Sequence, residues 1–174
     1  DYEEAVRWFR LGAEQRVARS QFHLGVLYHQ GEGVPQDYAE AAKWIRMAAE
    51  QGYAEALYIL GGMYRIGNGV PQDEAEAVRW WRAAAELGFP GGMFALGGLY
   101  NIGNAVPQDY VQAHKWYNLA TANETSETLK ERWVTRRDEW AERMTPEQVA
   151  EAQRLATEWE PKEWEVIRQE LGIE

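Results

Sequence analysis

The amino-acid sequence predicts an all-α fold, an α/α superhelical solenoid of stacked helix-turn-helix units followed by a helical segment outside the repeats. The first observation is a loop motif, Gly-x-Gly-Val-Pro-Gln-Asp, at residues 31–37 and 67–73, which returns with one change at 103–109. The second is the constant spacing of 36 residues between the copies. A single helix hairpin cannot bury its apolar face, but stacked neighbours bury it together. The third is a set of tryptophans in the same register, namely Trp8, Trp44, Trp80 and Trp116.

Length and composition indicate a folded protein and restrict its partners. With 174 residues, of which 45% are hydrophobic and 13% aromatic, the chain can bury a core. The formal net charge of −10 argues against a nucleic-acid partner. No run of about eighteen apolar residues occurs, so we expect no membrane insertion. The absence of cysteine excludes disulfides and thiolate metal sites, but it leaves the compartment open.

The first helix of each aligned segment is marked by its start. An Asp is followed three residues later by Glu or Gln, as in Asp37 with Glu40, which is typical of a capping box with Asp at the N-cap. The residues that follow show apolar side chains at intervals of three and four. We call these the B helices and expect them at about 1–14, 37–50, 73–86 and 109–122.

A second helix, which we call the A helix, is expected in each unit at about 18–30, 54–66 and 90–102. Gly52 and Gly88 follow two of the B helices, where a left-handed residue ends a helix, whereas Arg16 stands at the first such position. The Val-Pro pair after each A helix favours an extended exit before the next Asp. Inside the units, Gly25, Gly61 and Gly97 are expected to permit close helix approach, and the tryptophans and Tyr28, Tyr64 and Tyr100 are expected to pack.

The period fails beyond Ala122, so we divide the chain into a repeat array at 1–122 and a helical capping segment at 123–174. We expect a long helix at 126–144, a second one from Thr145 to about Trp159 with Pro146 in its first turn, and a short last helix at 161–172. Atypical, more polar units of this kind are typical of solenoid ends.

The second unit has a specific pattern. Residues 54–73 read Ala-x-Ala-x-x-x-Leu-Gly-x-x-Tyr-x-x-Gly-x-Gly-Val-Pro-x-Asp, and Ala77, Trp80, Ala84 and Ala85 follow. This pattern resembles the Sel1-like repeat (SLR), a relative of the tetratricopeptide repeat, and the resemblance extends over residues 1 to about 122. The stretch 144–148, Met-Thr-Pro-Glu-Gln, also looks like the C-terminal end of many bacterial members. The resemblance implies a right-handed superhelix and a non-catalytic adaptor that holds other proteins together.

In tetratricopeptide-like arrays the A helices line the concave surface, so the resemblance implies a groove there that binds a peptide or protein segment. Side chains opposite the Leu60 face of the A helix are its candidates. They are Arg19, Phe22, Val26 and His29 in the first A helix, Glu55, Tyr58, Gly62, Arg65 and Ile66 in the second, and Phe94, Gly98, Asn101 and Ile102 in the third.

Two features of this set suggest what it binds. Phe22, Tyr58 and Phe94 form an aromatic row that either clamps a partner segment or packs against the neighbouring A helix. Arg19, His29 and Arg65 add positive charge, which favours a partner with an acidic segment or a C-terminal carboxylate.

Enzyme chemistry has little support in the sequence. His23, His29 and His114 show no spacing typical of paired metal ligands, and no nucleophile or phosphate-binding motif occurs. We expect no catalytic residue, no metal and no cofactor. The alternative is an envelope-associated hydrolase or an antibiotic- or peptidoglycan-binding protein, as suggested for cysteine-rich relatives, although this chain has no cysteine.

The N-terminal end suggests self-association. The chain starts at Asp1, partway through a repeat, and we interpret it as a fragment or processed form; a segment of a longer solenoid is a further alternative. The first B helix then lacks the A helix of its own unit, so Val6, Phe9 and Ala13, with Trp8 close by, are expected to be uncovered. Either two copies meet through residues 1 to about 30 as a homodimer, or the first helix frays.

Overall fold

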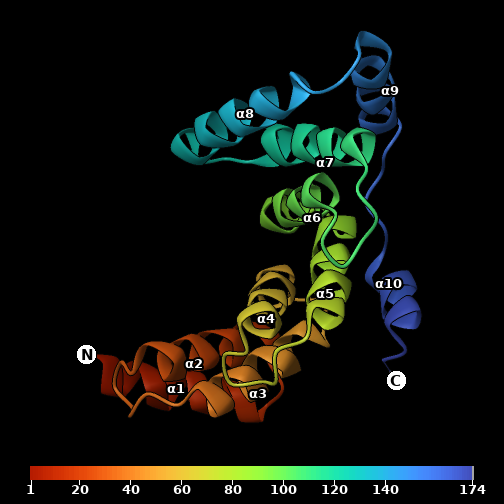
Figure 1. Ribbon diagram of the computed structural model, residues 1–174. Coiled ribbons are helices and arrows are strands. Elements are labelled where there is room, and N and C mark those ends of the chain that lie inside the picture. Colours follow the sequence, from red (N-terminus) through yellow and green to blue (C-terminus); the bar gives the residue numbers. More distant parts are fainter. Residues whose placement is uncertain (174) are drawn as a thin grey trace. The chain divides into compact units, whose positions relative to one another are not determined.

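The computed structural model describes residues 1–173, and these form ten α-helices and no strand (Figure 1). The chain is an α/α solenoid, as predicted. None of the helices in this part of the chain is long and apolar enough to cross a membrane. The helices are α1 (Tyr2–Glu14), α2 (Ala18–Gln30), α3 (Tyr38–Ala49), α4 (Ala54–Ile66), α5 (Glu74–Glu86), α6 (Pro90–Ile102), α7 (Tyr110–Asn123), α8 (Glu127–Ala141), α9 (Pro146–Thr157) and α10 (Trp164–Leu171).

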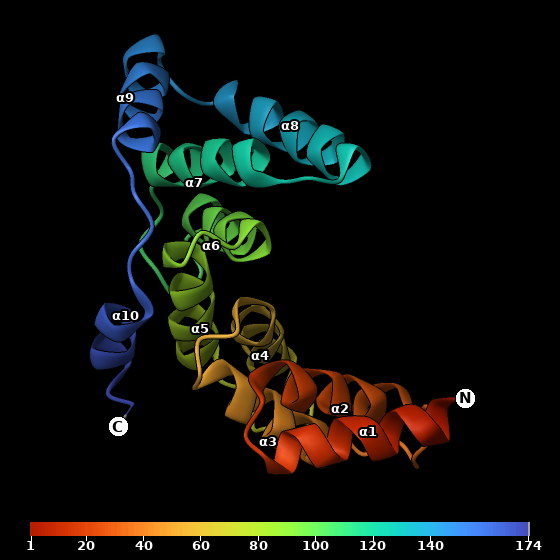
Figure 2. The same cartoon turned by 180° about the vertical axis from the view of Figure 1, so that it is seen from behind.

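The helices group into two compact units. The first consists of residues 1–80 with the segment from Arg168 onward, and the second of Trp81–Ile167. In each unit an A helix packs along the B helix that follows it, α2 along α3 and α6 along α7 (Figure 2). A Cβ atom on Gly25 would lie 2.6 Å from Ile45 Cγ1, and one on Gly97 would lie 2.9 Å from Tyr117 Cε1. These two glycines therefore permit the close helix approach that the sequence predicted.

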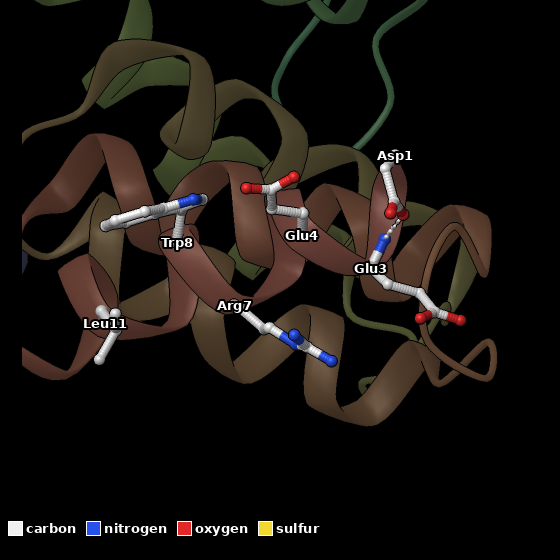
Figure 3. Close-up of a pocket in the computed structure, with 6 residues that line it drawn as sticks. All are labelled: Asp1, Glu3, Glu4, Arg7, Trp8 and Leu11. Carbon is white, nitrogen blue, oxygen red and sulfur yellow. Dashed lines mark hydrogen bonds between the residues drawn. The ribbon is translucent and has the colours of Figure 1, made fainter.

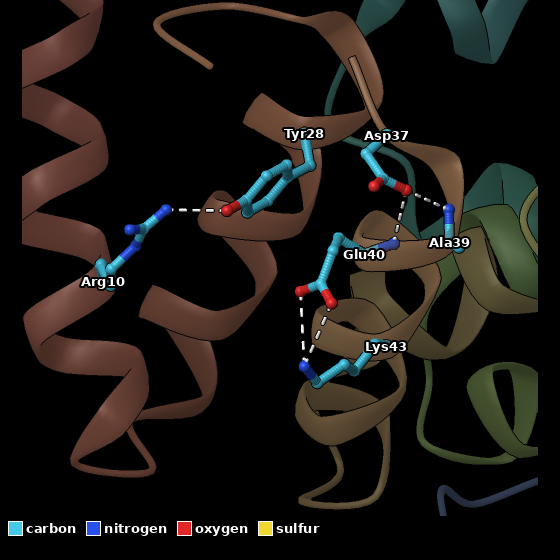
Figure 4. Close-up of polar contacts among 6 residues, drawn as sticks. All are labelled: Arg10, Tyr28, Asp37, Ala39, Glu40 and Lys43. Carbon is cyan, nitrogen blue, oxygen red and sulfur yellow. Dashed lines mark hydrogen bonds and ion pairs between the residues drawn. The ribbon is translucent and has the colours of Figure 1, made fainter. Parts of the chain in front are cut away.

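The loop motif fixes how each A helix ends and the next B helix begins. Gly31 ends α2 with φ 73°, and Asp37 accepts hydrogen bonds from the backbone N–H groups of Ala39 and Glu40 at 2.9 and 3.0 Å (Figure 4). The motif glutamine has a role that sequence reasoning missed, since the Gln36 side chain donates to the carbonyl of His29 at 2.8 Å. Gln72 and Gln108 repeat this bond to the carbonyls of Arg65 and Asn101.

A second recurring hydrogen bond joins each B helix to the next A helix. An arginine of the B helix donates to a tyrosine hydroxyl eighteen residues later, at 2.7 Å for Arg10 and Tyr28 (Figure 4). Since the sequence suggested only packing for the tyrosines, this bond was missed. The same pairing recurs between Arg46 and Tyr64 and between Arg82 and Tyr100. Between α7 and α8 a different bond occurs, because Arg137 donates to the side chain of Asn118, nineteen residues earlier, at 3.3 Å.

Two residues that replace a glycine of the other repeats adopt the left-handed backbone conformation of that glycine. Arg16 has φ 62° and Ala105 has φ 56°, the positive values otherwise found only at glycines in the described residues. The turn at Arg16 has an extra support. Gln21 is buried, donates to the carbonyl of Ala13 at 3.1 Å and accepts from the Gln51 side chain at 2.6 Å. The first turn therefore replaces glycine with a buried hydrogen-bond chain.

The capping segment begins one of its helices at the repeat interval. Thr145, the N-cap of α9, lies 36 residues after Asp109, the N-cap of α7, while the division of the chain into an array at 1–122 and a capping segment at 123–174 stays a prediction. Helix α9 contacts α7 and stands across its end, apart from α8 (Figures 1 and 2). The residue equivalent to Gly97 is Trp133, whose ring stacks on Phe94 of α6. Helices α8 and α9 therefore do not repeat the side-by-side packing of α6 and α7.

Replacing Arg16 by Gly should stabilise the fold, because an L-residue in the left-handed region is strained and Arg16 is exposed. Glycine loses more backbone entropy on folding than arginine does. After this cost is subtracted from the relief of strain, we expect the free energy of unfolding to rise by about 0.5–1 kcal/mol. Urea titration measures this gain. The matched control, Gly52→Ala, should lose about 1 kcal/mol at the equivalent turn, and a less stable Arg16→Gly protein would contradict the account.

Candidate functional site on the A helices

In the first compact unit, which contains α2 and α4, the candidate residues on these two helices all retain solvent exposure. Phe22, Val26 and His29 of α2 are half-buried, and so are Tyr58 and Gly62 of α4. The remaining candidates, Arg19, Glu55, Arg65 and Ile66, are exposed, and Ile66 has 63% of its surface accessible. Their joint role as one groove stays a prediction.

Phe22 lies in an aromatic cluster. Its ring centroid is 5.1 Å from that of Tyr53, the residue before α4, and 5.4 Å from that of His23. Phe9 of α1 stacks on the other side of His23 at 4.9 Å. Burial and the nearby Arg19 lower the pKa of His23, so this ring favours the neutral form. Phe22 thus packs against the adjoining repeat and still presents part of its ring to solvent.

His29 is held by two neighbours. Its Nε2 atom lies 3.1 Å from Asn68 Nδ2, and its ring meets that of Tyr38 edge-on at 5.1 Å. Asn68 was not among the predicted residues. The sequence offered one indication of its role, because Asn68 occupies the variable position inside the loop motif at 67–73. The bond connects the ends of two successive A helices, so His29 has a structural role beside any role in charge recognition.

In the second compact unit, the candidates on α6 contact α7 and α8 to different degrees. The Phe94 ring stacks on Trp133 of α8, with centroids 4.8 Å apart and an interplanar angle of 17°. A Cβ on Gly98 would lie 3.5 Å from the Tyr117 hydroxyl, and Asn101 is only 6% exposed. Ile102 alone of the four α6 candidates is exposed, at 70%. Here the aromatic position is used for packing within the chain.

Three buried polar atoms near α8 have no hydrogen-bond partner among the described residues: Asn101 Oδ1, His114 Nδ1 and the Tyr117 hydroxyl. Burial, reinforced by Arg137, lowers the pKa of His114, and Asp138 opposes this shift. Burial also raises the pKa of Tyr117. Sequence reasoning treated His114 only as a poor metal ligand. The missed signal was its register, because the equivalent residues Val6, Ala42 and Val78 are apolar and buried.

Helix α1 carries a hollow on its surface, and only part of the expected uncovered apolar face is exposed. Val6 and Ala13 are 6% and 1% exposed, packed against Leu24 and Leu27 of α2, so the expectation that they are uncovered was wrong. Phe9 is half-buried. The exposed residues are instead Trp8 at 67% and Leu11 at 52%. They line the hollow together with Asp1, Glu3, Glu4 and Arg7 (Figure 3).

No group of three or more His, Asp or Glu side chains within residues 1–173 is arranged to hold a metal ion. The candidate residues on α2 and α4 comprise aromatic rings, an exposed aliphatic side chain and charged groups.

Comparison with known proteins agrees with the repeat architecture. A family model described as the Sel1 repeat matches residues 1–17, 18–53, 54–89 and 90–124. Among solved structures, the chain is similar to a protective antigen of uropathogenic Escherichia coli that displays an SLR fold, with 45% identity and a TM-score of 0.69 over 72% of this chain. The chain spans only 27% of that antigen. No curated protein matches.

A second solved structure is a Sel1 repeat protein from Oxalobacter formigenes, with 38% identity and a TM-score of 0.65. The similarity covers 73% of this chain and 95% of that one. The two proteins thus agree with the family model on the repeat architecture.

Replacing His114 by Val should stabilise the chain and reduce its sensitivity to acid. Removing a buried polar group without a partner should raise the free energy of unfolding by about 1 kcal/mol or more at neutral pH. The cavity left by the smaller side chain reduces this gain. Since the folded-state pKa of His114 lies below the unfolded value, the parent loses stability as the pH falls through about 6.5. The gain in unfolding free energy, measured with urea, should therefore be larger at pH 5 than at pH 8. An equal gain at both would contradict this assignment.

Proposed function

Because the chain belongs to the Sel1 repeat family, whose members are generally non-catalytic protein-interaction scaffolds, we propose that it binds an acidic segment of a partner protein on α2 and α4. The observation that carries the proposal is the partly exposed aromatic pair Phe22 and Tyr58, one repeat apart within one compact unit. Aromatic rings offer a large contact area at low conformational cost and dominate binding energy at many interfaces.

The charges on this surface support an acidic partner. Arg19 and Arg65 are exposed on α2 and α4, and Glu55 is the one acid among the candidates there. The chain as a whole has a net charge of −10, so this group of candidates differs in sign from the average of the chain. Guanidinium groups bind carboxylates through paired hydrogen bonds, and opposite charges raise the association rate.

The alternative of an envelope-associated hydrolase, or of an antibiotic- or peptidoglycan-binding protein, is not favoured by any contact described above. The protective antigen that is similar to this chain displays an SLR fold, and the similarity identifies no catalytic residue. The binding proposal therefore stands as the better explanation of the exposed residues.

A displayed library of random twelve-residue peptides, selected on the purified chain, tests the proposal. Selected peptides should be enriched in Asp and Glu, and their affinity should fall as salt is raised. The double variant Arg19→Glu, Arg65→Glu should bind the best peptide at least tenfold more weakly. Fluorescence anisotropy measures both effects.

The matched control for this experiment is Arg132→Glu, an exposed charge reversal on α8, which should leave the affinity unchanged. Equal binding by the double variant and the parent would exclude the electrostatic part of the proposal. Failure to select any peptide would argue against a peptide-binding surface.

We also propose that α1 is a contact surface for a second copy of the chain. The support is the exposure of Trp8 and Leu11, since large apolar side chains grouped on a surface often mark contacts between proteins. Val6 and Ala13 do not contribute, because α2 buries them.

Sedimentation of the parent beside Trp8→Glu tests self-association. The parent should form a dimer at high micromolar concentration, and Trp8→Glu should remain a monomer, because a carboxylate at the contact would be buried. Trp8 is exposed, so the variant should keep the helical circular dichroism of the parent. A monomeric parent at all concentrations would contradict the proposal.

A further inference from the structure

We infer that two copies of the chain pair through α1 in an antiparallel, two-fold arrangement, with Arg7 of each copy facing Glu14 of the other and Leu11 at the centre. This inference rests on the proposed self-association through α1, to which it adds an orientation and the side chains that specify it. The support is the pattern of apolar and charged side chains on one exposed face of this helix.

The exposed face of α1 carries two kinds of side chain. Helix α2 packs on the other side of α1, against a core that includes Val6. With about 100° between successive residues, Trp8, Arg7 and Glu14 all lie within about 60° of Leu11. All four are exposed, and Figure 3 shows Arg7, Trp8 and Leu11 on the surface of the helix. Trp8 lies on one side of Leu11, and Arg7 and Glu14 lie on the other.

In the next repeat, the apolar side chains at these positions are better covered. Trp44 and Met47 of α3 lie 36 residues after Trp8 and Leu11, and both are half-buried. Trp44 packs against the core that α1 and α2 form. Trp8 and Leu11 are 67% and 52% exposed. A second copy placed on α1 would remove this apolar surface from water, which stabilises the pair.

The charged side chains determine the orientation. Arg7 and Glu14 are separated by about 10 Å along the helix. Within residues 1–173 neither forms an ion pair with another side chain. An antiparallel pair whose two-fold axis passes beside Leu11 places Arg7 of each copy opposite Glu14 of the other. A parallel pair would instead place like charges side by side, so electrostatics favours the antiparallel pair.

The same arrangement also packs the apolar residues. Leu11 lies beside the axis and meets Leu11 of the second copy. A two-fold axis that runs across the helices keeps each side of the face on its own side. The Trp8 side chains of both copies therefore lie along one edge of the contact, and both ion pairs lie along the other. Apolar contact at the centre and charged pairs at the rim are typical of protein interfaces.

Charge reversals test this arrangement by sedimentation velocity. Arg7→Glu and Glu14→Arg should each weaken the dimer about tenfold or more, because the two-fold axis repeats every change at two contacts. An equimolar mixture of the two variants should associate about as tightly as the parent, since each new charge then faces its opposite in both contacts. A fluorescent label on one variant identifies the mixed dimer.

The matched control is Glu3→Arg, which makes the same change of charge as Glu14→Arg on the same side of α1, but away from Arg7 of the second copy. This control should keep the dimer affinity within about twofold of the parent. All three positions are exposed, so circular dichroism should show the helix content of the parent in each variant.

The outcomes separate the arrangement from self-association itself. If the parent dimerises and Trp8→Glu does not, but the mixture associates no better than either variant alone, the antiparallel arrangement is wrong and the proposed self-association remains. An equal loss of affinity in Glu3→Arg and Glu14→Arg would also overturn the pairing of Arg7 with Glu14. A parent that stays monomeric at all concentrations contradicts both proposals. Recovery in the mixture, with Glu3→Arg unaffected, supports both.

Discussion

The regular part of this chain depends on how closely an A helix approaches the B helix that follows it. At Gly25 and Gly97 the missing Cβ atom lets the helix backbone approach Ile45 and Tyr117. Dispersion attraction falls steeply with separation, so a small gap would remove much of the contact energy. The hydrogen bond between Arg10 and Tyr28 also joins two helices, whereas the Asp cap and the glutamine bond connect residues close in the sequence and fix the loop that precedes each B helix.

Much of the fold was predictable because its signals are local. The A helices were expected at 18–30, 54–66 and 90–102 and are found there, since glycine at the end and the Asp cap that follows define each boundary. The bond between Arg10 and Tyr28 was missed because its two partners lie on different helices. The packing of α9 against α7 was not predicted either, since contacts between helices distant in the sequence leave no local signal.

The candidate site was also predictable only where neighbouring residues of one helix determine exposure, and not where a later segment does. Helical geometry predicts which side chains of an A helix face away from its own core, and Phe22 and Arg19 retain exposure. It does not predict what a later segment covers, and so Phe94 and Asn101 were grouped with them although α8 lies against this part of α6. Register was an unused signal: apolar equivalents at Val6 and Ala42 indicate that His114 is buried.

Trp133 marks a change in the repeat pattern. The equivalent position of the three earlier A helices is glycine, whereas the Trp133 ring stacks on Phe94 of the preceding repeat. Contacts of this chain also extend beyond neighbouring repeats, because Arg79 of α5 donates to the carbonyl of Leu171 at 2.8 Å. A repeat inserted between α5 and α10 would therefore have to preserve or replace this long-range bond.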